Sequence, residues 1–262
     1  MGQILALANQ KGGVGKTTTS VNLAASLAAT KRKVLLIDLD PQGNATMGVG
    51  VDKHALEKTF CDVLLDGVDI NSCIHKLDEI GIHLLPSNAD LTAAEVELMR
   101  ADGAENRMKD VIIPLKEHYD YILIDCPPAL NMLTLNALVA SDGVIIPMQC
   151  EYYALEGLTS LMDTIKQVQD SVNPQLKVEG LLRTMFDPRN TLSNDVSAQL
   201  IEHFGDTVYR TIVPRNVRLA EAPSYGLPAL MYEKTSRGAL AYLALAGEML
   251  RREARSAAAL MR

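Results

Sequence analysis

The stretch NQKGGVGKTTTS, residues 9–20, follows the apolar run ILALA and precedes VNLAASLAA. It is close to the pattern of a phosphate-binding loop, in which glycine, four further residues, Gly-Lys and then Ser or Thr stand between a strand and a helix. Counting back from Gly15-Lys16-Thr17 puts the first glycine of this pattern at position 10, where the chain has Gln10. The next residue is Lys11, so the loop has a second lysine that the general pattern does not explain.

The composition is that of a globular protein. The 262 residues are enough for one large α/β domain, and 48% of them are hydrophobic and 22% charged. Because the net charge is −7, any contact with nucleic acid must be a local patch. No run of 18 apolar residues indicates a membrane span, and the first residues lack the features of a signal peptide or a myristoylation site. We therefore expect a cytoplasmic protein without an anchor.

The cysteines give no sign of a metal site or a redox motif. Their spacing contains no CxxC pair, and none of them lies among histidines placed as zinc ligands. We expect four reduced, buried thiols at Cys61, Cys73, Cys126 and Cys150.

Short apolar runs alternate with helical patterns along the chain. Strands are expected at residues 3–8, 33–38, 81–86, 121–125, 143–148, 178–186 and 207–213. Helices are expected at residues 16–29, 92–100, 105–118, 131–140, 154–170, 191–204 and 237–262. Nearly continuous apolar strands between helices predict an α/β fold with a doubly wound, mostly parallel sheet covered on both faces. We see no linker or repeat, so we expect a single doubly wound domain over residues 1–262.

In such a sheet, ligands bind beyond the carboxyl ends of the strands. The residues that follow each apolar run are therefore the ones that carry chemistry. They are residues 11–18, 38–44 and 125–128, together with QCEYYALEG (149–157), DPRN (187–190) and PRNVRLAEAPSYG (214–226).

The glycine-rich loop has the parts needed to bind phosphate. Gly12, Gly13 and Gly15 let the backbone approach an anion closely, and the start of the next helix adds a positive field. Lys16 can place a charge on the β- and γ-phosphates, and the Thr17 hydroxyl can bind Mg²⁺. A glycine turn with an exposed lysine is the alternative, which the preceding strand and following helix disfavour.

Two further loops add carboxylates to the same edge of the predicted sheet. Asp38 and Asp40 lie in IDLDPQGNAT (37–46), and Asp125 ends the apolar strand in YILIDCPP (121–128). A carboxylate beside the γ-phosphate can orient the attacking water, and an apolar strand that ends in Asp has the form of a Walker B strand. Each signal alone is weak because Asp is also a common turn former. Together with the loop they favour a nucleotide site.

These motifs resemble the ParA/Soj family of chromosome- and plasmid-partitioning ATPases, within the wider group that has a deviant Walker A loop. The resemblance runs nearly end to end. The loop alone is shared with membrane-bound septum-site regulators, nitrogenase iron protein and arsenite pumps. Residues 147–158 and 213–228, in contrast, match a pattern that is specific to the partitioning branch. Residues 48–110 match only loosely and are unassigned. The matching stretches are residues 9–28, 34–46, 120–130, 147–158 and 213–228.

The resemblance explains the second lysine. In the family this residue, here Lys11, is the signature lysine, which reaches across a nucleotide-sandwich homodimer to the phosphates bound by the other subunit. Gln10 at the position of the missing glycine then follows the family's own pattern. A lysine that acts in trans couples assembly to bound ATP, because it stabilises the dimer only when phosphate is present.

The resemblance also implies roles for individual residues, with ATP and Mg²⁺ as cofactors. Thr17 and Asp125 would hold Mg²⁺, Asp40 would position the hydrolytic water, and Pro214 and Asn216 would frame the adenine. Lys11, Lys16, Asp40 and Asp125 would be the catalytic residues. No glutamate suited to act as a base is evident near the loop, so we expect slow turnover without a partner. The loop residues expected to bind nucleotide are Lys11, Gly12, Gly13, Val14, Gly15, Lys16, Thr17 and Thr18.

For DNA, the resemblance points to Arg189 and Arg218, which match family positions that bind DNA without sequence preference. Residues 183–218 contain five arginines, offset by Asp187, Asp195, Glu202 and Asp206, so a dimer should be needed for binding. The implied function is an ATPase that dimerises, binds nucleoid DNA and is discharged by a ParB-type partner, without contact to a membrane. The five arginines are Arg183, Arg189, Arg210, Arg215 and Arg218.

Two other classes of function compete with this interpretation. A membrane-surface regulator of division-site placement would need a C-terminal amphipathic helix with bulky apolar residues, but the apolar residues of EMLRREARSAAALMR (248–262) are mostly alanines. A nucleotide-gated scaffold without hydrolysis is disfavoured by the presence of both Asp40 and Asp125. Iron–sulfur chemistry is set aside, because Cys126 and Cys150 lack the required motif context.

Overall fold

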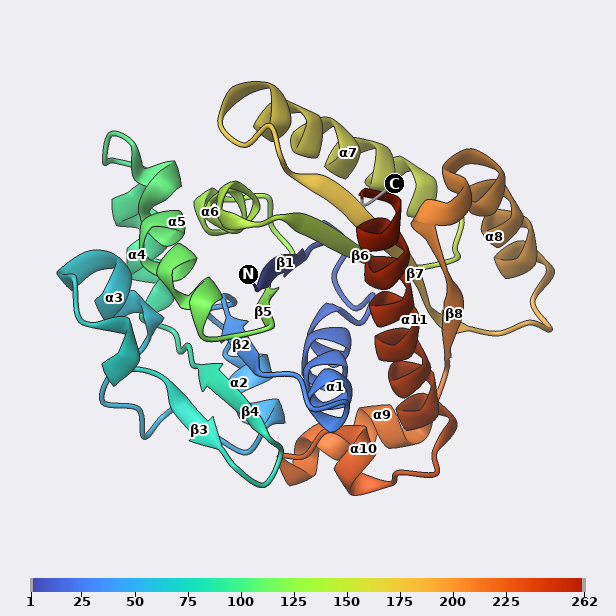
Figure 1. The fold of residues 1–262 in the computed structure, drawn as a ribbon, viewed down its shortest axis with the longest axis horizontal. Coiled ribbons are helices and arrows are strands. Elements are labelled where there is room, and N and C mark those ends of the chain that lie inside the picture. Colours follow the sequence, from blue (N-terminus) through green and yellow to red (C-terminus); the bar gives the residue numbers. More distant parts are fainter. Residues whose placement is uncertain (1, 261–262) are drawn as a thin grey trace.

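The structure, a computed structural model, describes residues 2–260 and contains one eight-stranded sheet between two layers of helices (Figure 1). The strand order is β3-β4-β2-β5-β1-β6-β7-β8. The pairings are parallel except for β3 with β4. This confirms the expected α/β fold with a mostly parallel sheet. The strands are β1 (Gln3–Leu7), β2 (Val34–Asp38), β3 (His75–Leu77), β4 (Ile82–Leu85), β5 (Tyr121–Asp125), β6 (Gly143–Gln149), β7 (Lys177–Phe186) and β8 (Val208–Pro214).

Helices follow most of the strands. The longer ones are α1 (Lys16–Ala29), α4 (Leu91–Leu98), α6 (Met132–Ala140), α7 (Ala154–Ser171), α8 (Thr191–Phe204) and α11 (Arg237–Leu260). The shorter α-helices are α2 (Asn44–Gly48), α3 (Phe60–Asp66), α5 (Arg107–Ile112), α9 (Val217–Glu221) and α10 (Ala229–Tyr232). The 3-10 turns are η1 (Ile70–Ser72), η2 (Ala104–Asn106), η3 (Ile113–Glu117), η4 (Gly205–Thr207) and η5 (Ala222–Tyr225).

The sheet separates two hydrophobic clusters, and β1 shows how. Ile4 and Ala6 pack with helices α3 to α8 on one face. Leu5 and Leu7 pack with α1, α9, α10 and α11 on the other. Successive side chains of a strand point to opposite faces, so a strand covered on both faces must be apolar at every position. This is why the apolar runs in the sequence located the central strands well.

The structure departs from the expectations at the periphery. The antiparallel edge strand β3 has three residues, none of them fully buried, and no apolar run marks it in the sequence. The helix expected at 105–118 is broken into η2, α5 and η3. Pro114 lies in its last part, where it has no N–H to continue an α-helix. The expected C-terminal helix is present as α11, and its last two positions, 261 and 262, lie outside the described residues.

The parallel register brings the three sequence motifs together. Leu7, at the end of β1, and Asp38, at the end of β2, both pair with Asp125 at the end of β5. The glycine-rich loop, the Asp40 loop and the Asp125 loop therefore leave the same edge of the sheet side by side, as in other doubly wound folds.

The cysteines lie as expected within the described residues. Cys61, Cys73, Cys126 and Cys150 are all free and buried. Among residues 2–260, no helix combines the length and the apolar character needed to cross a membrane.

Candidate functional site

The glycine-rich loop adopts a shape that requires glycine. Gly13 and Gly15 have φ angles of +74° and +87°, in the left-handed region that side chains with a Cβ rarely adopt. A Cβ added at Gly12 or Gly13 would meet no atom within 4 Å, so the backbone there borders open space. Helix α1 begins at Lys16, directly after this turn, and its first N–H groups have no partner within the helix. The loop can therefore surround an anion.

Side chains from the loop and from a neighbouring strand hold it in place. Asn9 donates through Nδ2 to the carbonyl oxygen of Pro147 at 2.8 Å and accepts from the backbone N–H of Lys11 at 2.9 Å. Thr184 of β7 donates its hydroxyl to the carbonyl oxygen of Val14 at 2.7 Å. The sequence analysis assigned no role to Asn9 or Thr184, because their partners are distant in the chain.

Lys16 is held inside the loop. Its side chain is buried, and Nζ donates to the carbonyl oxygen of Lys11 at 3.3 Å. Burial lowers the pKa of the Lys16 ammonium group, and the charges of Asp125 and Asp40 oppose that shift. The buried ammonium group of Lys16 is therefore placed to bind a negatively charged group in the loop of its own chain.

Lys11 has a different environment. Its side chain is 40% exposed, and Nζ lies 2.6 Å from Oε2 of Glu151, whose side chain is 50% exposed. Glu151 lies beside the loop in the segment between β6 and α7, a contact that the sequence did not indicate, and the expectation that no glutamate there is suited to act as a base stays a prediction. The Glu151 carboxylate is paired with Lys11. Glu151 belongs to QCEYYALEG (149–157), which follows a strand, but nothing in that stretch indicates a contact with the loop.

Gln10, the residue at the position of the missing glycine, makes a second contact with the same region. Its Nε2 donates to Oγ of Ser160, on α7, at 2.9 Å. Gln10, which stands where the general pattern has glycine, thus connects the loop to α7.

Asp38 and Asp125 are paired in register on adjacent strands and are both fully buried. Asp38 has a structural task, since its Oδ2 accepts from both the backbone N–H and the hydroxyl of Thr46 at 2.7 Å. Burial is the main reason that the pKa of Asp38 is raised, and the Thr46 hydrogen bonds oppose the rise.

Asp125 is less completely bonded. Its Oδ1 lies 2.7 Å from the hydroxyl of Ser20, whereas its Oδ2 is buried without a hydrogen-bond partner among the described residues. Burial and then the charge of Asp38 raise the pKa of Asp125, and the hydroxyls of Ser20 and Thr17 oppose the rise. A buried carboxylate oxygen without a donor is costly, but it suits Mg²⁺ or a water bound to Mg²⁺, since this cation prefers oxygen ligands. The residues present therefore fit a magnesium site at Thr17 and Asp125.

Asp40 lies in the loop that follows β2, two residues beyond the end of the strand, and is partly exposed. Its Oδ1 accepts from the backbone N–H of Gln42 at 2.9 Å, and its carbonyl oxygen accepts from the Ser87 hydroxyl at 2.6 Å. Its charge acts on both Lys16 and Asp125. The three predicted residues Lys16, Asp40 and Asp125 are thus brought together.

Pro214 and Asn216 lie where β8 ends and α9 begins. Oδ1 of Asn216 accepts from the backbone N–H of Arg218 at 3.1 Å and caps α9. Since this contact uses only the side-chain oxygen, the amide nitrogen of Asn216 has no protein partner among the described residues. The role of both residues at the adenine stays a prediction.

The predicted DNA-binding arginines are at the surface, and each is paired with a nearby acid. Arg189 is bidentate to Asp187 at 2.9 and 2.8 Å, and Arg218 lies 2.6 Å from Oε2 of Glu221. Arg183, one of the five arginines in residues 183–218, does not lie at the surface with them. It is buried and donates to the hydroxyl of Ser197 and to a carbonyl oxygen of β8.

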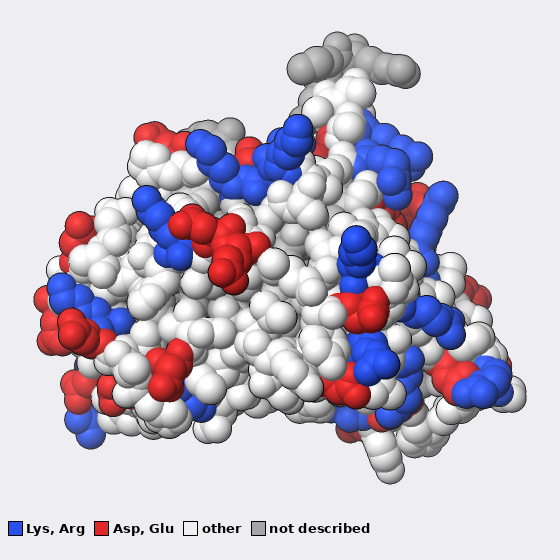
Figure 2. All heavy atoms as spheres, turned by 90° about the horizontal axis from the view of Figure 1, so that it is seen from below, with Lys and Arg blue, Asp and Glu red and all other residues white. Residues whose placement is uncertain are grey.

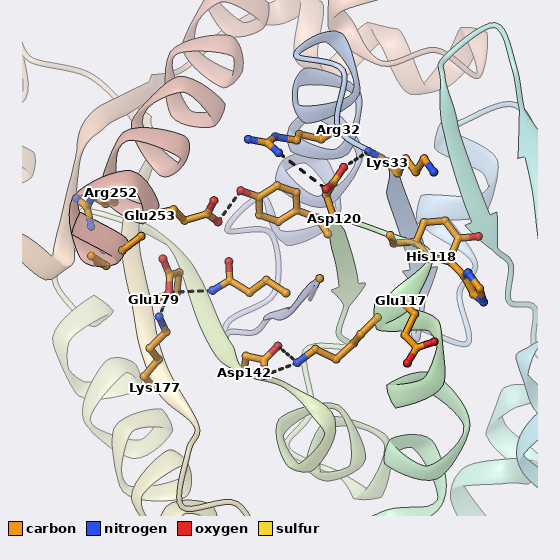
Figure 3. A pocket seen from close by; sticks show the side chains of 17 residues that line it. Arg32, Lys33, Glu117, His118, Asp120, Asp142, Lys177, Glu179, Arg252 and Glu253 are labelled. Atoms are coloured by element: carbon orange, nitrogen blue, oxygen red, sulfur yellow. Dashed lines mark hydrogen bonds and ion pairs between the residues drawn. The ribbon is translucent and has the colours of Figure 1, made fainter. Parts of the chain in front are cut away.

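A polar cavity of about 920 Å³ lies at the opposite edge of the sheet, where the strands begin (Figure 3). Figure 3 shows Lys177 paired with Glu179 and Arg32 paired with Asp120. Asp142, which also lines the cavity, is paired with Lys116 at 2.8 Å. Because these groups neutralise each other and lie away from the loop, the cavity is no part of the candidate nucleotide site.

Comparisons with known proteins agree with this geometry. A family profile described as an AAA domain matches residues 2–178. Sporulation initiation inhibitor protein Soj of Bacillus subtilis is 50% identical over 249 residues, covering 95% of this chain and 98% of that protein. Chromosome partitioning protein ParA of Myxococcus xanthus is 49% identical over 253 residues, covering 97% and 89%. The crystal structure of cobyrinic acid a,c-diamide synthase from Mycobacterium smegmatis with bound ATP analogue and magnesium has a TM-score of 0.84 at 39% identity, covering 96% of this chain and 95% of that one.

Proposed function

The chain belongs to the ParA/Soj family of chromosome-partitioning ATPases, and we propose that ATP and Mg²⁺ convert it into a nucleotide-sandwich homodimer that binds DNA without sequence preference. Hydrolysis, stimulated by a ParB-type partner, then releases the DNA. The whole of residues 1–262 acts as one P-loop ATPase domain, and the protein is cytoplasmic and associated with the nucleoid.

Nucleotide binding is assigned to the loop and its neighbours. The backbone of Lys11, Gly12, Gly13, Val14 and Gly15 surrounds the phosphates, while Lys16, Thr17 and Thr18 contact them from the start of α1. The related structure from Mycobacterium smegmatis holds an ATP analogue and magnesium, which supports ATP and Mg²⁺ as the cofactors here. When bound, Mg²⁺ neutralises charge on the phosphates.

Around that nucleotide, the chain's own residues have separate tasks. Thr17 and Asp125 hold Mg²⁺ directly or through water, and the unpartnered Oδ2 of Asp125 supports this assignment. Asp40 orients the attacking water beside the γ-phosphate. Pro214 and Asn216 frame the adenine.

The observation that carries the proposal is the contrast between the two lysines. Lys16 is buried in its own loop, whereas the side chain of Lys11 is partly exposed and, among residues 2–260, is held only by an exposed carboxylate. An exposed ion pair contributes about 0–1 kcal/mol, so little free energy is needed to release Lys11. Multiply charged phosphates on a second subunit are a stronger partner for it.

DNA binding is assigned to Arg189 and Arg218. Both are exposed, but Asp187 and Glu221 cancel much of their charge in one subunit. A dimer doubles the number of arginines that can contact phosphates, and affinity depends steeply on that number. This accounts for DNA binding that depends on ATP in a protein of net charge −7.

The test compares nucleotide states on unrelated DNA fragments of equal length. We expect hydrolysis of ATP, binding to every fragment with ATP or a slowly hydrolysed analogue, weak binding with ADP, and loss of binding at elevated salt. Equal binding with ADP, or a strong preference for one fragment, would contradict the proposal. Pelleting with liposomes in the presence of ATP tests the membrane-surface alternative, for which we expect no recovery with the vesicles.

A further inference from the structure

The turn that follows α2 and the turn that follows η5 touch through their backbones. Gly50 and Gly226 lie at these turns, with φ angles of +86° and +64°. A Cβ added to Gly226 would lie 2.6 Å from the Cα of Gly50, and one added to Gly50 would lie 3.1 Å from the carbonyl oxygen of Gly226. Non-bonded carbon atoms are normally about 3.5–4.0 Å apart. The contact therefore requires glycine at position 226 and favours it at position 50.

The close approach, and not the left-handed turn alone, distinguishes this pair of glycines. Gly67 and Gly103 have similar φ angles of +65° and +70°. A Cβ added to either of them would meet no atom within 4 Å. The backbone contact between Gly50 and Gly226 therefore places two segments of the chain directly against each other.

One of these segments belongs to the candidate nucleotide site. It runs from Asp38, at the end of β2, to Gly50. Thr46 ties its two ends together, because its N–H and hydroxyl donate to Oδ2 of Asp38 and its carbonyl oxygen accepts from the backbone N–H of Val51 at 3.2 Å. The turn at Gly50 is thus connected by hydrogen bonds to the buried carboxylate that is paired in register with Asp125.

The other segment carries one of the two arginines to which DNA binding is assigned. Helix α9 includes Arg218 and is followed directly by η5, which ends at Gly226. The buried side chain of Leu219, also in α9, lies in the same hydrophobic cluster as Val49. Helix α9 and η5 therefore form one unit that rests on the turn at Gly50.

We propose that Gly50 and Gly226 are positioning residues for DNA binding: their contact sets the place of α9, and with it Arg218, according to the nucleotide that is bound. Closely packed atoms transmit displacement, so a shift of residues 38–50 moves the turn at Gly226. Asp40 lies in that segment, beside the site assigned to the γ-phosphate. This inference rests on the proposed function, because it takes ATP to bind at the loop and DNA at Arg218.

The contact adds a second source of coupling to that of the dimer. Dimerisation changes the number of arginines that face DNA, whereas the contact changes the position of α9 in each subunit. By thermodynamic linkage, DNA tightens the binding of nucleotide by the same factor by which nucleotide tightens the binding of DNA. Loss of the contact should lower this factor without preventing dimerisation.

The test compares two alanine variants that share the strain of a left-handed turn. Gly226→Ala adds the overlap with Gly50, whereas Gly67→Ala, at nearly the same φ, adds none. With a slowly hydrolysed ATP analogue, light scattering should find a dimer for both. Fluorescence anisotropy should find DNA binding weaker by about tenfold or more in Gly226→Ala and unchanged in Gly67→Ala.

The reciprocal measurement separates positioning from a general loss of stability. Isothermal titration of the analogue with and without DNA gives the factor by which DNA tightens nucleotide binding. This factor should fall about tenfold in Gly226→Ala and stay constant in Gly67→Ala, although urea unfolding should show both variants destabilised. Unchanged DNA affinity of the Gly226→Ala dimer, an equal loss in Gly67→Ala, or loss of the dimer in Gly226→Ala alone would each overturn the proposal.

A second variant and a measurement on the unchanged chain cover the case in which Gly226→Ala does not fold. Gly50→Ala makes the less severe overlap and should have the same effect on DNA binding. In the unchanged chain, the N–H groups of Gly50 and Gly226 donate to the carbonyl oxygens of Met47 and Pro223 at 3.0 Å. Hydrogen exchange at both turns should differ between ADP and the analogue, and a difference confined to one turn would overturn the coupling.

Failure of the proposed function gives a different result. An unchanged chain that binds no DNA in the presence of the analogue would contradict the proposed function. Hydrogen exchange at the two turns would still decide whether the nucleotide acts on α9 through the contact between Gly50 and Gly226.

Discussion

At the scale of single residues, the environment of each lysine decides its role. The sequence predicted that Lys16, Asp40 and Asp125 lie close together, because each lies at or beyond the carboxyl end of a buried parallel strand. It did not show Asn9, Ser160 or Glu151 as contacts of the loop, since these pairings join residues about 140–150 positions apart and depend on how α7 packs. The local motif was predictable from the sequence, and its supporting contacts were not.

The two lysines should respond differently to removal when ADP binding to the monomer is measured. Lys16→Ala removes a buried charge from the phosphate site and should weaken ADP binding by at least about tenfold. Lys11→Ala should leave ADP affinity nearly unchanged, because its proposed contact is to the other subunit. Isothermal titration with Mg·ADP measures both, and Lys53→Ala, at a partly exposed lysine of another loop, is the control. Similar losses in the two loop variants would make Lys11 an ordinary ligand of its own site.

Asp40→Ala should separate binding from hydrolysis. Removing a group that orients water affects the transition state more than the bound substrate, so we expect ATP affinity close to that of the unchanged chain and turnover lower by about a hundredfold. Asp52→Ala, at an exposed acid further along the same loop region, should change neither. Loss of ATP binding in Asp40→Ala would assign this residue to binding.

At the scale of elements, the central strands were predictable and the short helices were not. Strands covered on both faces leave continuous apolar runs, whereas α2, α9 and α10 have only five, five and four residues. A helix that short has no stable periodic pattern and forms only with tertiary packing. The contact between α11 and β8 likewise depends on a polar residue, Glu248, that the sequence did not mark.

Glu248 joins α11 to β8 and gives a prediction for pH. Its carboxylate accepts from the backbone N–H groups of Arg210 and Thr211 at 2.9 and 2.8 Å. Burial acts to raise the pKa of Glu248, but these bonds and those from Thr211 Oγ1 and Arg252 lower it below its usual value. The stabilisation that comes from this lowered pKa is present in full above the pKa of an unfolded glutamate, about 4.3. It is lost as the pH falls through the lower pKa that Glu248 has in the folded protein.

Glu248→Gln should therefore lower the free energy of unfolding by about 1–3 kcal/mol at pH 7. The difference from the unchanged chain should shrink as the pH falls below about 4. Urea unfolding at several pH values measures it, with Glu57→Gln as an exposed control. A difference that stays constant or grows toward low pH would contradict the role of the ionised carboxylate.

At the scale of the whole molecule, charged side chains of both signs are dispersed over the surface. On the face shown in Figure 2, basic and acidic side chains are interspersed over the surface. Arg189 and Arg218 follow the same rule, since each has an acid as its nearest charged partner. At these two positions one subunit thus offers DNA little uncompensated charge, which is why we expect DNA binding to require a dimer.

Charge reversal tests that requirement. Arg189→Glu and Arg218→Glu should each abolish ATP-dependent DNA binding and leave the ATP dimer intact. Arg100→Glu is the matched control, because Arg100 pairs with Glu97 at the same i,i+3 spacing as Arg218 with Glu221. Fluorescence anisotropy over a range of salt concentrations measures the effect. An equal loss in all three variants would show that net charge, and not these two positions, controls binding.

The central claim is that Lys11 couples ATP to assembly, and the molar mass in solution tests it most directly. Light scattering during size-exclusion chromatography should find a monomer with ADP and a dimer with a slowly hydrolysed ATP analogue, without DNA. Lys11→Ala should remain a monomer in saturating analogue, although equilibrium dialysis shows the analogue bound. A dimer of Lys11→Ala with the analogue, or a dimer of the unchanged chain with ADP alone, would contradict the account.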